Sequence, residues 1–359
     1  MRKKNGARML GARRAGVVAI IAFWYGLATP LAAVAAGPPE QFPLSFPSRL
    51  GNLSLSFTEF DWNQKTGDFI IPGEIKGKTA KSDFRADRAN GNDKVGYITL
   101  IGHVVVHSQG GGQGARAGQP VSVTSDQLRY DYRAGIYTAT GNVHASQGDA
   151  TLAAAAMRLD DTGRVADLSG GVHYQEAGGR SLSTQALTYH TDNGDYLVPG
   201  QLSGNAPDGS FSADSASGNG PHNDVTLVGD VVVHKLGGFR KVGDSNQPIT
   251  LECTTLQVQS SQKLYTASGH VKVIQGARVM TAPLMRLDDN THVLKMTGGV
   301  HAIEPPSSTF DAPEVIYNTE TQDFRALGGV HATVPVNALS RKASPKPKST
   351  PESTKPPAH

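Results

Sequence analysis

The 359-residue sequence is poor in cysteine, hydrophobic residues and charge. Its one cysteine, Cys253, excludes a disulfide framework within the chain, and we interpret it as a small buried side chain. Hydrophobic residues make up 38% and charged residues 18% of the sequence, whereas glycine occurs 41 times. This balance favours many short strands joined by tight turns over a helical protein.

The net charge of +3 conceals an acidic body. Six basic residues lie in the first fourteen positions, and five more lie after Val336 with a single acid, Glu352. Without these ends, 23 basic and 30 acidic residues remain, a net charge of −7. A nucleic-acid partner would require a basic body, so we predict none.

Motifs of catalysis are also missing. The sequence has no Gly-x-Ser-x-Gly, no phosphate-cradling glycine loop before a helix and no usable Cys/His pair. The pairs Asp160/Asp161 and Asp288/Asp289 precede turn residues, and neighbours at a strand end point to opposite sides. We therefore predict turn formers there, no enzyme and no cofactor.

What the sequence has instead is a Gly-x-Val mark that recurs along almost the whole chain. The marker glycines are Gly73, Gly102, Gly141, Gly170, Gly200, Gly229, Gly269, Gly298 and Gly328. Their spacings are 29, 39, 29 and 30, followed by 29, 40, 29 and 30. A period near 30 predicts one supersecondary unit stacked nine times, and the second series predicts a duplication.

Residue identities support this duplication over 127 or 128 positions. Val104-Val-Val-His107 returns as Val231-Val-Val-His234, and Arg158-Leu-Asp-Asp161 returns as Arg286-Leu-Asp-Asp289. Two halves are therefore expected, residues 53–199 and 200–337. A stack of equivalent units makes a long groove or edge more naturally than a single catalytic pocket.

Counting from each marker glycine shows a period of two. The second residue on is always apolar and the fourth is small or apolar, whereas the third is mostly polar. This alternation predicts a half-buried strand with one inward face. The inward apolar column is expected to contain Ile75, Val104, Val106, Val143, Val172, Leu202, Val231, Val233, Val271, Val300 and Val330.

A second strand type follows each turn, with apolar pairs two residues apart such as Leu128/Tyr130 and Met157/Leu159. Each unit is thus expected to hold two strands, about eighteen in all. The fold class predicted is all-β, closed as a sandwich, a curled jelly-roll-like sheet or a solenoid. If alternate strands form two facing sheets, the mixture of Gly and Ala with larger residues leaves the interior partly underfilled.

The chain ends have a different composition. Residues 1–36 combine a basic segment, an apolar run from Val17 to Leu27 and an alanine-rich end, which predicts a signal peptide cleaved after Ala35 or Ala36. The alternative is a retained membrane anchor from Ala15 to Ala36. Either one places the body outside the cytoplasm. Residues 37–52 are a proline-rich connector, and residues 338–359 are a Lys/Pro/Ser-rich tail expected to be disordered.

Repeated units of the form Leu128-Arg-Tyr-Asp131…Tyr137-Thr-Ala-Thr-Gly-Asn-Val143 resemble the OstA-like family of periplasmic lipopolysaccharide-transport bridge proteins. The resemblance covers about Leu53 to Val334 and implies a V-shaped β-jelly roll that holds acyl chains in an open groove. It also implies partners: lipopolysaccharide, an inner-membrane extractor complex, an outer-membrane translocon and head-to-tail copies, joined by edge-strand pairing. This chain differs in having two modules in tandem. It either replaces an oligomer or merges the bridge with its membrane-anchored neighbour.

The resemblance gives the inward column the role of a lipid-binding wall. In the two glycine-rich stretches, Arg116, Arg240 and Lys241 are candidates for contacts with lipid phosphates, although flexible hairpin loops would have the same composition. His107, His144, His173, His234, His301 and His331 share the opposite face. No metal-ligand motif accompanies them, so we expect solvated histidines and no metal site.

Two readings of function remain open. The first is binding and transfer of lipopolysaccharide through the periplasm. The second is a structural or adhesive β-solenoid with a filled interior, and an open or packed interior distinguishes the two. The first and last strands, Leu53 to Trp62 and Phe324 to Val334, carry few charges that would block pairing, which favours strand addition to a partner over simple capping.

Overall fold

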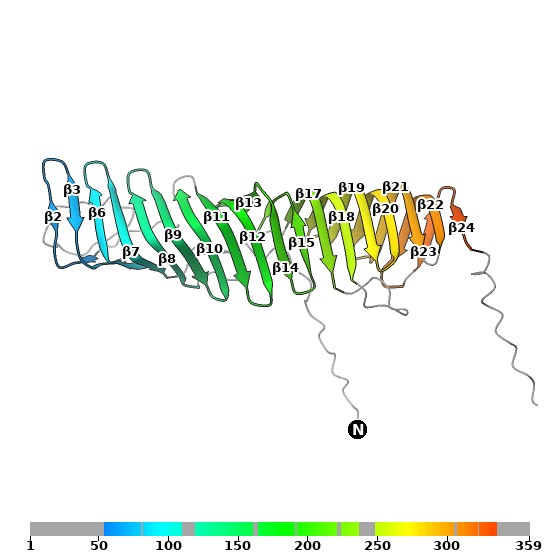
Figure 1. The fold of residues 1–359 in the computed structure, drawn as a ribbon, viewed down its shortest axis with the longest axis horizontal. Coiled ribbons are helices and arrows are strands. Elements are labelled where there is room, and N and C mark those ends of the chain that lie inside the picture. The colour runs from blue at the N-terminus through cyan, green and yellow to red at the C-terminus, as the bar shows by residue number, and fades with distance from the viewer. Residues whose placement is uncertain are drawn as a thin grey trace, which may run out of the picture.

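The computed structural model describes residues 54–79, 82–109, 119–160, 164–190, 192–220, 224–236, 248–304, 307–321 and 323–335. These residues form a single antiparallel sheet of 24 strands and contain no helix. In Figure 1 the strands run across the long axis of an elongated body, from β2 at one end to β24 at the other. The all-β class predicted from the sequence is confirmed.

Twelve strands are long and unbroken. They are β7 (Tyr97–Ser108), β8 (Val121–Asp131), β9 (Ile136–Gln147), β10 (Ala150–Asp160), β11 (Val165–Glu176), β12 (Arg180–His190), β17 (Asp224–Lys235), β18 (Ile249–Gln259), β19 (Leu264–Gln275), β20 (Arg278–Asp288), β21 (Val293–Glu304) and β22 (Ser308–Asn318). Each one pairs with the strands before and after it in the sequence, so the chain is a meander.

The other twelve strands are short and lie end to end in pairs, each pair filling one row of the sheet. They are β1 (Ser54–Ser56) with β2 (Asp61–Trp62), β3 (Asp68–Ile71) with β4 (Ile75–Lys78), β5 (Ser82–Ala86) with β6 (Arg88–Asn92), β13 (Asp195–Val198) with β14 (Leu202–Ala206), β15 (Gly209–Ala213) with β16 (Ser215–Asn219), and β23 (Phe324–Leu327) with β24 (His331–Thr333). The sheet therefore has eighteen rows, as two strands in each of nine units predict.

Each marker glycine lies in the middle of a row, where the strand bends. At Gly102 and at its neighbour His103 the backbone φ is 80° and 43°, and the pairing with β8 shifts register between Ile101 and Val104. Two successive residues with positive φ turn the strand through a corner. Pro72 and Pro199 precede the markers of two rows that are split into separate strands, because proline has no N–H for the ladder.

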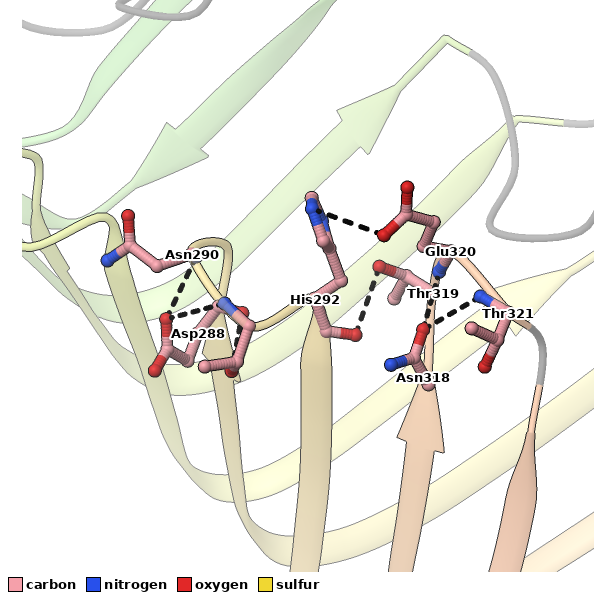
Figure 2. A network of polar contacts seen from close by, with 8 residues as sticks. Asp288, Asn290, His292, Asn318, Thr319, Glu320 and Thr321 are labelled. Carbon is pink, nitrogen blue, oxygen red and sulfur yellow. Dashed lines mark hydrogen bonds and ion pairs between the residues drawn. The ribbon is translucent and has the colours of Figure 1, made fainter.

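The corners divide the sheet into two walls. We call the wall that contains Tyr97–Ile101 the preceding wall and the wall that contains Val104–Ser108 the following wall. Because adjacent rows are antiparallel, Val121–Ser125, the half of β8 before its corner, pairs with Val104–Ser108 and lies in the following wall. Figure 2 shows strands curving from one wall to the other. Every row, whether one long strand or two short ones, thus contributes to both walls, so the two facing sheets of alternate strands considered from the sequence do not occur in the described residues.

The core lies between the two walls. Leu168 precedes the corner of β11 and Val172 follows it, and both are exposed by 1% or less. A flat single sheet would leave one of its faces open to water, so this burial requires the walls to cover each other. The core forms two clusters, one from Phe69 to Tyr132 and one from Val121 to Val315, with Val106 packed against both.

Candidate functional site

The inward side chains of the two walls form an apolar column that runs through both halves of the chain. Eight of the residues predicted for it are exposed by 5% or less: Ile75, Val104, Val143, Val172, Leu202, Val231, Val271 and Val300. Val106 and Val233 are half-buried and pack against the same core. The period-two pattern thus placed these side chains on the inward face.

Val330 departs from the prediction, because 45% of its side chain is exposed. It lies between β23 and β24, which form the last described row and pair only with β22. Leu202 holds the same position in its unit, but the row of β15 and β16 covers it. The inward column therefore ends before Val330, which belongs to an open end of the sheet.

The column is closed to water along most of its length, so the structure does not show the open groove that the family resemblance implied. Val143 and Val271 are each 0% exposed, because side chains of the preceding and following walls pack against one another. A lipid chain would have to separate the walls to reach these residues. Among the described residues, backbone groups pair between adjacent rows, and no register pair joins the preceding wall to the following wall face to face.

The corners contain polar pairs that the sequence analysis missed. His103 Nδ1 lies 2.8 Å from Asp87 Oδ2, and Asn142 Nδ2 donates to Asp126 Oδ2 at 2.9 Å. The hydrogen bond to Asp87, followed by the charge of that residue, raises the pKa of His103. The signal was present in the sequence, since the residue after each marker is either glycine or one of His, Asn, Asp and Gln in most units.

Basic side chains lie along the edge of the following wall that is opposite to the corners. We call this edge, where β7 ends at Ser108 and β17 ends at Lys235, the following edge. Here Arg180 lies 3.7 Å from Glu176, Lys235 lies 3.2 Å from Asp208, and Arg278 lies 3.0 Å from Glu304. None of these three basic residues was predicted as a site residue.

The predicted phosphate contacts Arg116, Arg240 and Lys241 lie outside the described residues. The two loops that contain them connect β7 to β8 and β17 to β18. Because Ser108 and Lys235 end at the following edge, both loops start from this edge.

The opposite edge of the sheet is made of Asp- and Asn-rich turns (Figure 2). Asp288 accepts a hydrogen bond from the Asn290 N–H at 2.9 Å, and Asn318 accepts one from the Glu320 N–H at 2.9 Å. The bond from Asn290 is the main cause that lowers the pKa of Asp288. The prediction that Asp288 is a turn former is confirmed, and His292 lies 3.7 Å from Glu320 beside it.

The six histidines of the outward column are all exposed, as predicted. In His107, His173, His234 and His301, a ring nitrogen lies near a side chain of an adjacent row. His173 Nδ1 lies 3.1 Å from Ser183 Oγ, and His301 Nδ1 lies 2.7 Å from Asp311 Oδ1. For the equivalent pairs His107/His234 and His173/His301, the partner therefore differs between the two halves of the chain.

The predicted leader or anchor, the connector and the tail lie outside the described residues. In the part of the chain that the structure describes, no helix could cross a bilayer.

The sequence matches the family model of lipopolysaccharide-assembly, LptC-related proteins twice, over residues 69–176 and residues 200–305. Because the two matches cover more than half of the chain, the protein belongs to this family. Each match falls within one of the two predicted halves. The resemblance to lipopolysaccharide-transport proteins is thereby confirmed at the level of the family, which is one of assembly proteins and not of enzymes.

No curated protein matches the sequence. Among solved structures, the chain is similar to LptH, described as the LptA homologous periplasmic component of the conserved lipopolysaccharide transport device from Pseudomonas aeruginosa. The identity is 15%, and the alignment covers 66% of this chain and 95% of that chain with a TM-score of 0.15. Because the TM-score is this low, nothing about fold or function follows from the similarity.

Proposed function

We propose that this protein binds lipopolysaccharide in the periplasm with the acyl chains between its two walls, and passes it from the inner to the outer membrane as part of a protein bridge. The observation that carries this proposal is the apolar column, which continues from Ile75 to Val300 through both halves. An apolar column of this length suits a long hydrocarbon chain. The family match supports lipopolysaccharide as the lipid that carries this hydrocarbon chain.

Loading requires the walls to part along their edges. Parting them breaks side-chain packing but leaves the ladders between rows intact, since these ladders run along each wall. Each acyl CH₂ group that replaces the lost contacts contributes about 0.8 kcal/mol when it leaves water. Because successive units are equivalent, an acyl chain can move from one unit to the next with a low barrier. The energy for transport comes from another protein.

The ends of the sheet are proposed as the sites of partner binding. In the last described row, Phe324, Leu327 and Val330 are exposed, and β23 and β24 pair only with β22. An exposed apolar edge with free backbone groups is suited to strand addition. The partners proposed are the inner-membrane extractor complex, the outer-membrane translocon and head-to-tail copies of this chain.

Lipid phosphates are proposed to lie at the following edge. Arg180, Lys235 and Arg278 provide cationic groups there, and Arg116, Arg240 and Lys241 belong to loops that start from it. Guanidinium and ammonium groups form charge-assisted hydrogen bonds with phosphate oxygens.

A structural scaffold is the second candidate function. The observation that favours it is the closed interior, because Val143 and Val271 are each 0% exposed. A scaffold requires only a packed core, whereas a lipid carrier also requires walls that open.

Photocrosslinking in cells distinguishes the two candidates. A photoreactive residue replaces Val106 or Val233, which are half-buried on the inward face and occupy equivalent positions in the two halves. The adjacent Val105 and Val232 point outward and serve as matched controls. Lipopolysaccharide adducts at the inward pair alone support the carrier. Equal adducts at all four sites, or no adducts in a folded protein, contradict the carrier and favour the scaffold.

A further inference from the structure

The outer face of the following wall contains a depression of about 490 Å³ in the first half of the chain. Five successive rows form it, from Ser122 and Thr124 of β8 to Ser181 and Ser183 of β12. Its volume lies in the range of about 300–1,000 Å³ that is typical of small-molecule sites. The inward column lies on the other face of the same wall.

The outward side chains that line this depression are polar and carry no carboxylate, amine or guanidinium. They are serines, threonines, two histidines and a glutamine, with Ala153 in the middle. His144 and His173 are both exposed, and the second lies 3.1 Å from Ser183 Oγ. Hydroxyl groups both donate and accept hydrogen bonds, as do the two nitrogens of a neutral imidazole taken together.

The second half provides an internal comparison, because the same positions recur 128 residues later. Thr124 and His144 correspond to Glu252 and Lys272, which form an ion pair of 3.1 Å. Ser183 corresponds to Asp311, which lies 2.7 Å from His301. Ser146, Thr151 and Gln175 correspond to Ile274, Val279 and Ile303. The second half keeps hydroxyl groups at Thr250, Thr281 and Thr309, but it adds charged and apolar side chains at the other positions, whereas the first half has neither charge nor a large apolar side chain on this outward face.

We propose that the depression binds an uncharged stretch of glycan. Sugar hydroxyls donate and accept hydrogen bonds in the same way as the lining groups, so each can satisfy the other without a fixed charge. A phosphorylated or acidic ligand would require basic side chains, and an apolar ligand would require exposed apolar ones. Ala145, Leu152 and Tyr174 also line the depression, but they are exposed by 3% or less and offer little apolar surface to a ligand.

The site deepens the proposed function and rests on it in one respect. Ser146 and Thr151 bring the depression to the hairpin between β9 and β10 at the following edge. A lipid whose acyl chains lie between the walls and whose headgroup leaves at this edge would place its glycan on this outer face. The same chemistry would also suit the glycan of the cell wall.

The test uses saturation-transfer NMR to measure the binding of two probes to the purified full-length chain. One probe is the uncharged hexose oligosaccharide released from the outer core of lipopolysaccharide, and the other is an oligosaccharide of N-acetylglucosamine. The variant T124E/H144K installs the ion pair that the second half already accommodates at the same register, so it is expected to fold. The matched control E252T/K272H makes the reverse change outside the depression.

We expect a probe to bind wild type and control equally and to bind T124E/H144K about tenfold more weakly, a change of about 1.4 kcal/mol. The probe that binds identifies the source of the glycan. Equal binding to all three proteins, or no binding of either probe to wild type, overturns the proposal. Adducts at Val106 and Val233 report on the acyl chains separately, so failure of the glycan site and failure of the proposed function give different results.

Discussion

The two halves of this protein agree on their inward faces and differ on their outward faces. Val143 and its counterpart Val271 are both 0% exposed between the walls. On the outer face, Thr124 and His144 of the first half are replaced by the ion pair Glu252–Lys272 in the second. Packing between the walls constrains the inward residues of both copies, whereas the solvent-facing residues are free to acquire separate roles.

The largest effect is expected from a comparison of the same inward position in an internal row, at Leu202, and in the last described row, at Val330. Leu202→Ala should destabilise the fold by about 2–5 kcal/mol, because it removes a buried side chain that is covered on both sides. Val330→Ala should cost less than about 1 kcal/mol, because this side chain is already exposed. Urea unfolding monitored by circular dichroism measures both. Equal losses would show that another chain covers the last row in solution.

The next prediction compares the corners of the two halves. In Gly170→Ala the new Cβ would lie 2.5 Å from Ala155 Cβ, whereas in Gly298→Ala it would lie 3.0 Å from Pro283 Cγ. Both also require alanine at positive φ, which costs about 1–2 kcal/mol. We expect G170A to lower the unfolding free energy more than G298A.

Gly171→Ala is the control for these corner variants, because its Cβ would meet only His173 Nε2, at 3.9 Å. It should show the backbone cost alone. A loss in G171A as large as that in G170A would contradict the role assigned to the contact with Ala155.

A smaller effect concerns the position occupied by Ser125 in the first half and Cys253 in the second. Burial raises the pKa of the Cys253 thiol to about 11, so at pH 8 about one thiol in a thousand is the reactive thiolate. A thiol reagent should modify the folded protein far more slowly than the urea-unfolded chain. The double variant S125C/C253S should be equally slow, and rapid labelling of either protein would show that one half opens to solvent.

The same raised pKa has a consequence for stability. The unfolded thiol ionises at lower pH than the folded one, so the contribution of this thiol to the unfolding free energy should be constant well below pH 9 and should fall as the pH rises toward 11. Cys253→Ser should remove this part of the dependence, which is measured by urea unfolding from pH 8 to 10.

The smallest predicted effect concerns the corner pair His103–Asp87. Asp87 raises the pKa of His103, so the pair contributes stability below the unfolded histidine pKa of about 6.5 and loses it as the pH rises through the folded value. The corresponding positions of the second half are Asp230 and Asp214. His103→Asn should flatten the stability profile between pH 5 and 8. An unchanged profile would show that this solvated pair contributes nothing measurable.

The number of rows and the inward column could be predicted from the sequence. The spacing of the marker glycines gives the number of units, and the period of two gives the inward face of each strand. The bend within each strand could not be predicted from those patterns alone. It requires positive φ both at a marker glycine such as Gly102 and at the next residue, such as His103 or Asn142. The residue types at these two positions allow that conformation but do not require it, so the pattern permits a bend without establishing one. Without the bend, a sandwich, a curled jelly-roll-like sheet and a solenoid all remained possible.

The closed interior and the outer depression were also beyond the sequence. Whether Val143 lines a groove or a packed core depends on how closely the two walls approach, which no local pattern records. The depression joins side chains from Ser122 to Ser183 across five rows, so it exists only once these rows are placed side by side. By contrast, the exposure of Val330 could have been predicted from the number of rows. Val330 lies in the last described row, which no further row covers.

The meander also affects how the chain acquires its structure. Because each described row pairs with the rows that precede and follow it in the sequence, every new row closes only a short loop, at a small entropic cost. Folding can therefore proceed row by row from the N-terminal side, before the last residues have been synthesised. At each step the growing sheet ends in an uncovered apolar row, as the finished sheet does at Phe324 and Val330. The completed protein thus retains at its C-terminal end the surface on which another row could be added.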